Sequence, residues 1–175
     1  DLQMQTGPTT ICVGDLTTLS VDSIPGATYQ WYFTSVPLNG ATSPQFTTPA
    51  AGYYYVSVTT ACGTFSTDSV EIVVKSVENA SISNNQIICP PEMVQLHVSG
   101  GVTYLWTPST FISSSTSPDP IVAPQTTTTY AVEITNEWGC KVSLSTTVNV
   151  DCDTLLVPTG FSPNADGVND GYVID

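Results

Sequence analysis

The chain has 175 residues, and 10% of them are charged, against about 25% in an ordinary soluble domain. It carries two Lys, no Arg and 15 acidic residues, which gives a formal net charge of −13. This balance excludes binding to nucleic-acid phosphates and disfavours an anionic membrane surface, because both need many cations. No apolar run approaches the roughly 18 residues of a membrane span. Abundant Ser and Thr, with few Leu, Lys and Glu, favour strands over helices.

In the first part of the chain, apolar and polar residues alternate with period two, as they do in half-buried strands. We predict strands at 18–21, 53–58 and 69–74. Turn signals stand between them at Pro25-Gly26, Asn39-Gly40 and Ala51-Gly52.

The second part repeats the first with a period of about 76 residues. We predict strands at 94–98, 130–134 and 142–144, with turns at Gly100-Gly101 and Pro118-Asp119-Pro120. Cys12 and Cys62 are 50 residues apart, and Cys89 and Cys140 are 51 apart. The repeat predicts two tandem homologous modules, 1–76 and 77–151.

Short strands around a central Trp are typical of an Ig-like or PKD-like β-sandwich, so we predict an all-β protein. Trp31 and Trp106 are expected to fill the two cores, in preference to forming platforms for sugars. His97 lies in the alternating strand opposite Leu96, and we expect it to face solvent.

The segment from Phe161 to Asp170 reads F-S-P-N-A-D-G-V-N-D. It resembles the start of the gliding-motility-associated C-terminal sorting domain of proteins exported by the type IX secretion system of Bacteroidota, with Ala165 in place of the usual Gly. The resemblance implies that 152–175 is the start of this sorting domain, truncated after about one strand. The second copy, with Thr126 to Tyr130 and Asn136 to Cys140, resembles the Ig/PKD-type repeats that precede this domain in adhesins, and the first copy is a looser match. The matching motif residues are Phe161, Ser162, Pro163, Asn164, Asp166, Gly167, Asn169 and Asp170.

Five cysteines suggest disulfides and an oxidising location. Pairing within each copy, Cys12–Cys62 and Cys89–Cys140, is the first alternative. In a sandwich, however, the turn after Cys12 and the hairpin at Cys62 lie at opposite ends, and a strand of about 7 residues spans roughly 23 Å. A disulfide tolerates a Cα separation of only about 4.4–6.8 Å. End-to-end stacking instead favours Cys12–Cys140 and Cys89–Cys152, with Cys62 left to bond a missing upstream module.

Two kinds of modification or ligand site are candidates. The loop after Phe161 resembles half of a Ca²⁺ loop, with Asn164, Asp166, Val168 and Asp170 as candidate ligands, but the distal Glu is missing and an Asx-rich turn is the alternative. Calcium is the one cofactor that the sequence suggests. The Bacteroidota O-glycosylation signal, Asp followed by Ser or Thr and an aliphatic residue, occurs at three hydroxyls: Ser23, Ser69 and Thr154.

No nucleophile–His–acid constellation or phosphate loop stands out, so we do not expect an enzyme. Exposed aromatics such as Tyr32, Tyr53 and Trp138 are a candidate carbohydrate patch, although packing is the alternative, and Trp138 is expected at the module junction.

The expected function is that of spacer or stalk modules in a large secreted or cell-surface adhesin or filament, involved in adhesion or gliding. The expected partners are the type IX secretion machinery, outer-membrane components, neighbouring Ig-like modules and surface glycans. The alternative is a carbohydrate-binding or spacer module of a secreted polysaccharide-degrading enzyme.

Overall fold

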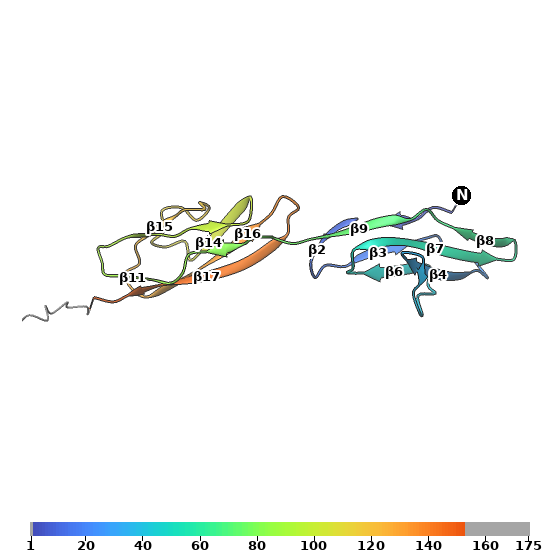
Figure 1. Ribbon diagram of the computed structural model, residues 1–175, viewed down its shortest axis with the longest axis horizontal. Helices are drawn as coiled ribbons and strands as arrows, with labels where there is room; N and C mark the ends of the chain where they lie inside the picture. Colours follow the sequence, from blue (N-terminus) through green and yellow to red (C-terminus); the bar gives the residue numbers. More distant parts are fainter. Residues whose placement is uncertain (1, 153–175) are drawn as a thin grey trace, which may run out of the picture.

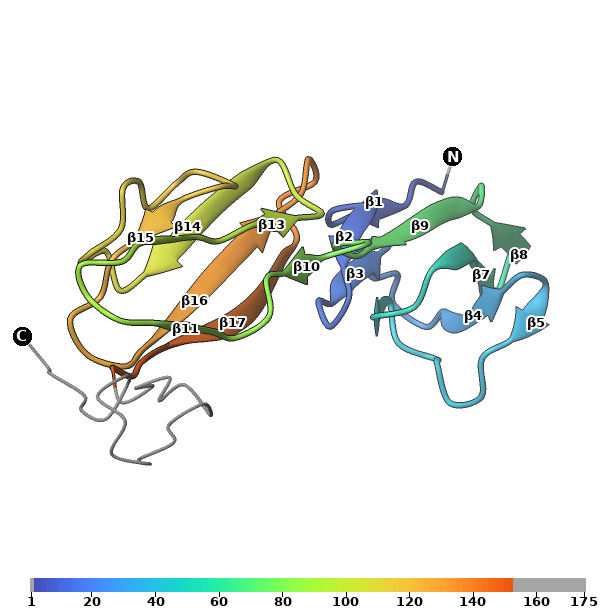
Figure 2. The same ribbon diagram turned by 60° about the vertical axis from the view of Figure 1, so that its left-hand side comes forward.

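The computed structural model describes residues 2–152, which form two β-sandwich modules placed end to end along the long axis of the molecule (Figure 1; Figure 2). The described residues contain no helix. The first module ends with a strand at Lys75, and the chain passes directly into the second module through 76–80. The predicted sorting motif and the candidate calcium ligands lie outside the described residues.

Two sheets face one another in the first module. One has the order β1 (Gln5–Thr6), β3 (Thr17–Ser20) and β6 (Gln45–Thr48). The other has the order β2 (Thr10–Cys12), β9 (Val70–Lys75), β7 (Gly52–Thr60), β4 (Thr28–Phe33) and β5 (Val36–Pro37), with β8 (Gly63–Ser66) paired to the far end of β7.

The second module repeats this plan. Its larger sheet has the order β11 (Gln86–Ile88), β17 (Lys141–Val150), β16 (Thr128–Thr135) and β14 (Thr103–Thr107). Opposite lie two short pairs, β10 (Ser81–Ile82) with β13 (Val98–Ser99), and β12 (Val94–Gln95) with β15 (Ile121–Val122).

Each module buries its own core, and each core is built around one tryptophan. Trp31 and Trp106 are 0% and 1% exposed, which confirms that they are core residues. Each indole N–H donates to a backbone carbonyl, Trp31 to Ser43 at 2.8 Å and Trp106 to Ser117 at 2.9 Å. The buried polar atom of each ring is therefore satisfied, so the large apolar surface is buried without an unpaired donor.

The sequence misplaced some strand boundaries. The predicted strand 94–98 is divided in two, because the His97 N–H donates to the Ser83 side-chain oxygen at 2.6 Å and not to a backbone carbonyl. The predicted strand 142–144 extends over Lys141–Val150. Gly52 begins β7 and does not form a turn. Its φ is +141°, and a Cβ there would lie 2.3 Å from the Phe33 ring, so only glycine fits.

The pairing of β2 with β9, and of β11 with β17, decides where the cysteines lie. Both pairs are parallel, so the end of the early strand meets the end of the module's last strand. Cys12 is the ladder partner of Lys75, the last residue of β9. It therefore stands at the end of the first module from which the chain leaves toward the second.

Candidate functional site at the module junction

A disulfide joins the two modules. Cys12 and Cys140 are bonded, with an S–S distance of 2.05 Å and a Cα–Cα distance of 5.3 Å, although 128 residues separate them in sequence. Cys140 is the last residue of the loop between β16 and β17, at the end of the second module that faces the first (Figure 1). The structure therefore has the cross-module pairing that the sequence favoured and not the pairing of Cys12 with Cys62.

The turn that follows Cys12 holds this cysteine in place. The Cys12 N–H donates to the Asp15 carboxylate at 3.3 Å, and the Asp15 N–H donates to the Cys12 carbonyl at 2.9 Å. The second module repeats the arrangement with Glu92 and Cys89, at 3.2 and 2.9 Å. The acid three residues after each cysteine thus fixes the geometry of the turn.

Asn136 connects the two modules without a covalent bond. Its side-chain oxygen accepts hydrogen bonds from the N–H groups of Trp138 at 3.0 Å and Cys140 at 2.9 Å, which shapes the β16–β17 loop. Its side-chain nitrogen donates to the Ser76 carbonyl in the linker at 2.9 Å. Asn136 is 9% exposed, so these bonds are largely protected from water.

A cation–π contact closes one side of the junction. The Lys75 amine lies 4.3 Å from the centroid of the Trp138 ring, which is 49% exposed. Lys75, Asn136 and Trp138 also line a groove of about 520 Å³ between the modules. Trp138 is therefore a junction residue, as expected, and it does not join Tyr32 and Tyr53 in one aromatic patch. The sequence analysis did not identify Lys75 or Asn136 as junction residues.

The second disulfide is different in kind. Cys89 is bonded to Cys152, with a Cα–Cα distance of 4.9 Å, and the Asp151 N–H donates to the Ile88 carbonyl at 3.0 Å. The strand registers make Cys152 the counterpart of Ser76 in the first module. The pairing is the expected one, but the partner is the second residue after β17 in the same module. This bond closes the end of the second module and does not cross to a further hairpin.

Cys62 is exposed and unpaired. It lies in the β7–β8 hairpin, at the end of the first module away from the junction. Its N–H donates to the Thr60 hydroxyl oxygen at 3.1 Å. Thr60 is the counterpart of Asn136, because Tyr54 and Tyr130 occupy equivalent positions in β7 and β16.

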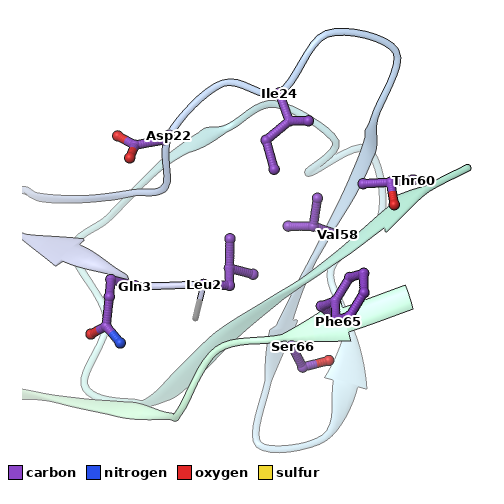
Figure 3. A pocket seen from close by; sticks show the side chains of 8 residues that line it. All are labelled: Leu2, Gln3, Asp22, Ile24, Val58, Thr60, Phe65 and Ser66. Atoms are coloured by element: carbon purple, nitrogen blue, oxygen red, sulfur yellow. The ribbon is translucent and has the colours of Figure 1, made fainter. Parts of the chain in front are cut away.

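The same end of the first module carries an open groove of about 680 Å³. Figure 3 shows apolar side chains from separate segments around it: Leu2, Ile24, Val58 and Phe65. Phe65 is 52% exposed and Ile24 is 38% exposed. Thr60 lines this groove as Asn136 lines the junction groove, so both lie at the same end of their modules.

The remaining candidates are surface residues or lie outside the described range. Ser23 and Ser69 are exposed, and Thr154 is not described. His97 faces solvent, as expected, and its ring pairs with the Asp119 carboxylate. Within residues 2–152, no group of three or more His, Cys, Asp or Glu is arranged to hold a metal, and there is no helix long and apolar enough to cross a membrane. The junction, with its disulfide, its Asn136 hydrogen bonds and its cation–π contact, is therefore the candidate site that we consider further.

Comparison with known proteins places the first module among Ig-like domains. A family model described as "Ig-like domain CHU_C associated" matches residues 3–75. The matched residues lie in the first module, and the match supports an Ig-like repeat there. A comparison with curated proteins found no match.

Similar solved structures are tandem immunoglobulin domains. The titin I-band fragment I67-I69 is 13% identical with a TM-score of 0.45, and the match covers 86% of this chain and 65% of that one. Sidekick-1 immunoglobulin domains 1-4 are 15% identical with a TM-score of 0.36, covering 86% and 48%. The insect immune protein hemolin is 15% identical with a TM-score of 0.44, covering 81% and 44%. The strand topology and the family match, taken together, describe an all-β tandem of Ig-like sandwiches that is similar over residues 3–75 to the CHU_C-associated Ig-like domain.

Proposed function

We propose that the two modules are consecutive spacers in the stalk of a large cell-surface adhesin or filament, and that their role is to hold a distal region away from the cell. The observation that carries this proposal is the Cys12–Cys140 bond, because it ties the exit of one sandwich to the entrance of the next. The Ig-like fold is typically non-catalytic, which supports a structural role.

Three contacts of different kinds restrain the same junction. The disulfide fixes one side, the Asn136 side chain holds the linker at Ser76, and Lys75 covers Trp138. Bending the modules apart would have to break the hydrogen bond and separate the cation from the ring. These two contacts are worth about 1 kcal/mol each, whereas the covalent bond cannot open without a reductant.

The stack continues upstream in this proposal. The first module presents Cys62, Thr60 and an apolar groove at the end where the second module presents Cys140, Asn136 and the junction groove. In the second module these features meet the cysteine turn of the preceding sandwich. An upstream Ig-like module would therefore cover the groove of Figure 3 and bond Cys62 through its own counterpart of Cys12.

Export and location are proposed from the terminal motif and the family match. The match supports an Ig-like repeat of a Bacteroidota-type protein. The motif Phe161 to Asp170 points to export by the type IX secretion system and to the outer surface of the cell, with a role in adhesion or gliding. The partners are then the secretion machinery, outer-membrane components, and further Ig-like modules of the same protein.

Small-angle scattering tests whether the junction is stiff. We expect the C12S/C140S variant to sample a wider range of module-to-module distances than the unaltered chain. The matched control is C89S/C152S, which removes a disulfide outside the junction and should leave the distance distribution unchanged. Equal distributions for the unaltered chain and C12S/C140S would argue against a disulfide-stiffened stalk.

Surface labelling tests the proposed location. An antibody against residues 2–152 should bind intact cells that express the parent protein and a working type IX secretion system. The same cells without that system should retain the antigen inside. Surface exposure in both strains would refute the export route and leave the stalk proposal standing.

A further inference from the structure

Three tyrosines gather on the outer face of the larger sheet of the first module. Tyr32 on β4 and Tyr55 on β7 are direct cross-strand partners, and their rings are stacked with centroids 4.7 Å apart and an interplanar angle of 1°. Tyr53 stands two residues before Tyr55 on the same face of β7 and is 50% exposed. None of the three belongs to the buried core of the module.

An open groove of about 410 Å³ lies beside these rings. Tyr53 and Tyr55 form part of it, the Thr34–Ser35 turn of the β4–β5 hairpin another part, and the segment from Ser66 to Ser69 the rest. Its lining therefore combines aromatic rings with five hydroxyl-bearing side chains and the Asp68 carboxylate. The aromatic rings can stack on apolar faces of a ligand. The Ser and Thr hydroxyls can donate hydrogen bonds to an alcohol or accept them from it, and the carboxylate can accept them.

Two features fix the geometry around Tyr53. Glu71, its cross-strand partner on β9, raises the pKa of Tyr53 through hydrogen bonding to the hydroxyl and through its negative charge. The Thr34 N–H donates to the Tyr53 carbonyl at 2.9 Å. Thr34 and Ser35 have φ of 45° and 70°, a conformation that hairpin turns usually give to Asn or Gly. The turn beside the groove thus departs from the residues that turn geometry alone would select.

The second module shows that the fold does not need these aromatic side chains. The same ladder position that pairs Tyr32 with Tyr55 pairs Thr107 with Ala131 in the second module. The position that pairs Tyr53 with Glu71 pairs Thr129 with Thr147. The second sheet therefore forms with small side chains where the first has three tyrosines and an acid, and the tyrosines call for an explanation other than folding.

We propose that this tyrosine groove binds a neutral glycan chain. Aromatic rings can stack on the C–H faces of pyranose rings, while the Ser, Thr and Asp68 side chains hydrogen-bond to sugar hydroxyls. Charge narrows the class of glycan. The chain carries −13 and only two Lys, and the groove contains a carboxylate and no cation, so uronic-acid and sulfated glycans are repelled.

The test begins with the full chain, its Cys62 replaced by Ser to prevent dimers. It is titrated calorimetrically with neutral soluble probes, namely cellohexaose, laminarihexaose, mannohexaose and chitohexaose, and with alginate as the anionic comparison. We expect a neutral probe to bind and alginate not to bind. The variant Y32T/Y53T/Y55A, which installs the counterpart residues of the second module, should lose the binding at least tenfold.

Two further variants keep the result interpretable. Y53T alone alters an exposed ring and should weaken binding severalfold even if the triple variant folds poorly. L105A alters an exposed apolar residue on the equivalent sheet of the second module and should bind as the unaltered chain does. No binding of any neutral probe at millimolar concentration, or binding that survives Y53T and the triple variant, would overturn the proposal. Neither result bears on the stalk, because the groove lies away from the junction residues.

Discussion

The disulfides determine how far this chain can be stretched, and the structure gives the lengths. When the ends are pulled, the load passes from Cys12 through the disulfide to Cys140 and bypasses the 128 residue steps between them. Of the described residues, about 22 steps then remain in the load path, or about 75 Å at about 3.4 Å per residue. Both sandwich cores lie almost entirely in the bypassed part.

Removing the bonds lengthens the path by amounts that differ between variants. In C12S/C140S the load passes through Cys89–Cys152, which bypasses 63 residue steps, so the same residues reach about 295 Å when unfolded. Removing both disulfides gives about 510 Å. C89S/C152S should stretch no further than the unaltered chain, because Cys89 lies inside the segment that Cys12–Cys140 already bypasses.

Single-molecule stretching of the full chain under non-reducing conditions measures these differences directly. All variants carry C62S, and residues 153–175 add the same length to each. The decisive number is the gain of about 220 Å in C12S/C140S over the unaltered chain. If that gain is absent, or if C89S/C152S shows it instead, then Cys12–Cys140 does not carry the load and the account of the junction is wrong.

Three other changes probe the junction and the cores. N136D keeps the oxygen that shapes the β16–β17 loop but loses the N–H group that donates to Ser76. Hydrogen exchange of the linker amides should become faster by a factor that corresponds to about 1–3 kcal/mol. The control is N149D, which alters a longer 3.5 Å hydrogen bond in the same module and should change linker exchange little. W31A should destabilise the first module by about 3–5 kcal/mol and leave the calorimetric transition of the second module nearly unchanged, while a shift of both transitions would contradict separate cores. S76C places a thiol where the second module has Cys152. A non-reducing peptide map should then show some molecules with Cys12 bonded to position 76 and others with Cys12 bonded to Cys140. A map with only Cys12–Cys140 would mean that the junction contacts select the partner.

The repeat in the sequence predicted the fold, and together with end-to-end stacking of the modules it favoured the cysteine pairing that the structure has. Cysteines at corresponding places in two copies, one near each end of a sandwich, cannot pair within a module once strand length is considered. Trp31 and Trp106 could be assigned to the cores because a large aromatic residue recurs in the middle of the third strand of each copy. These inferences need only local pattern and chain direction.

The noncovalent junction contacts could not be predicted in this way. Asn136 acts on Ser76, 60 residues away, and this requires the orientation of one module on the other. The stacking of Tyr55 on Tyr32 could not be predicted either, because the register of β4 on β7 determines which tyrosines are cross-strand partners. The break in the strand at His97 depends on one serine side chain that replaces a ladder bond.

The two copies show how a single position changes the consequence of the same fold. In both modules the early strand runs parallel to the last one and ends with a cysteine beside the chain that leaves the module. Where the next residue of the exit is Cys152, the cysteine bonds it and the end of the module is closed. Where that residue is Ser76, the cysteine remains available and the hairpin of the next module supplies the partner, while the backbone of Ser76 accepts the hydrogen bond from Asn136. We expect the side chain at this position, one residue past β9 and two residues past β17, to decide between these outcomes. A tandem array of such modules would then be covalently continuous at one junction and end its disulfide chain at the next.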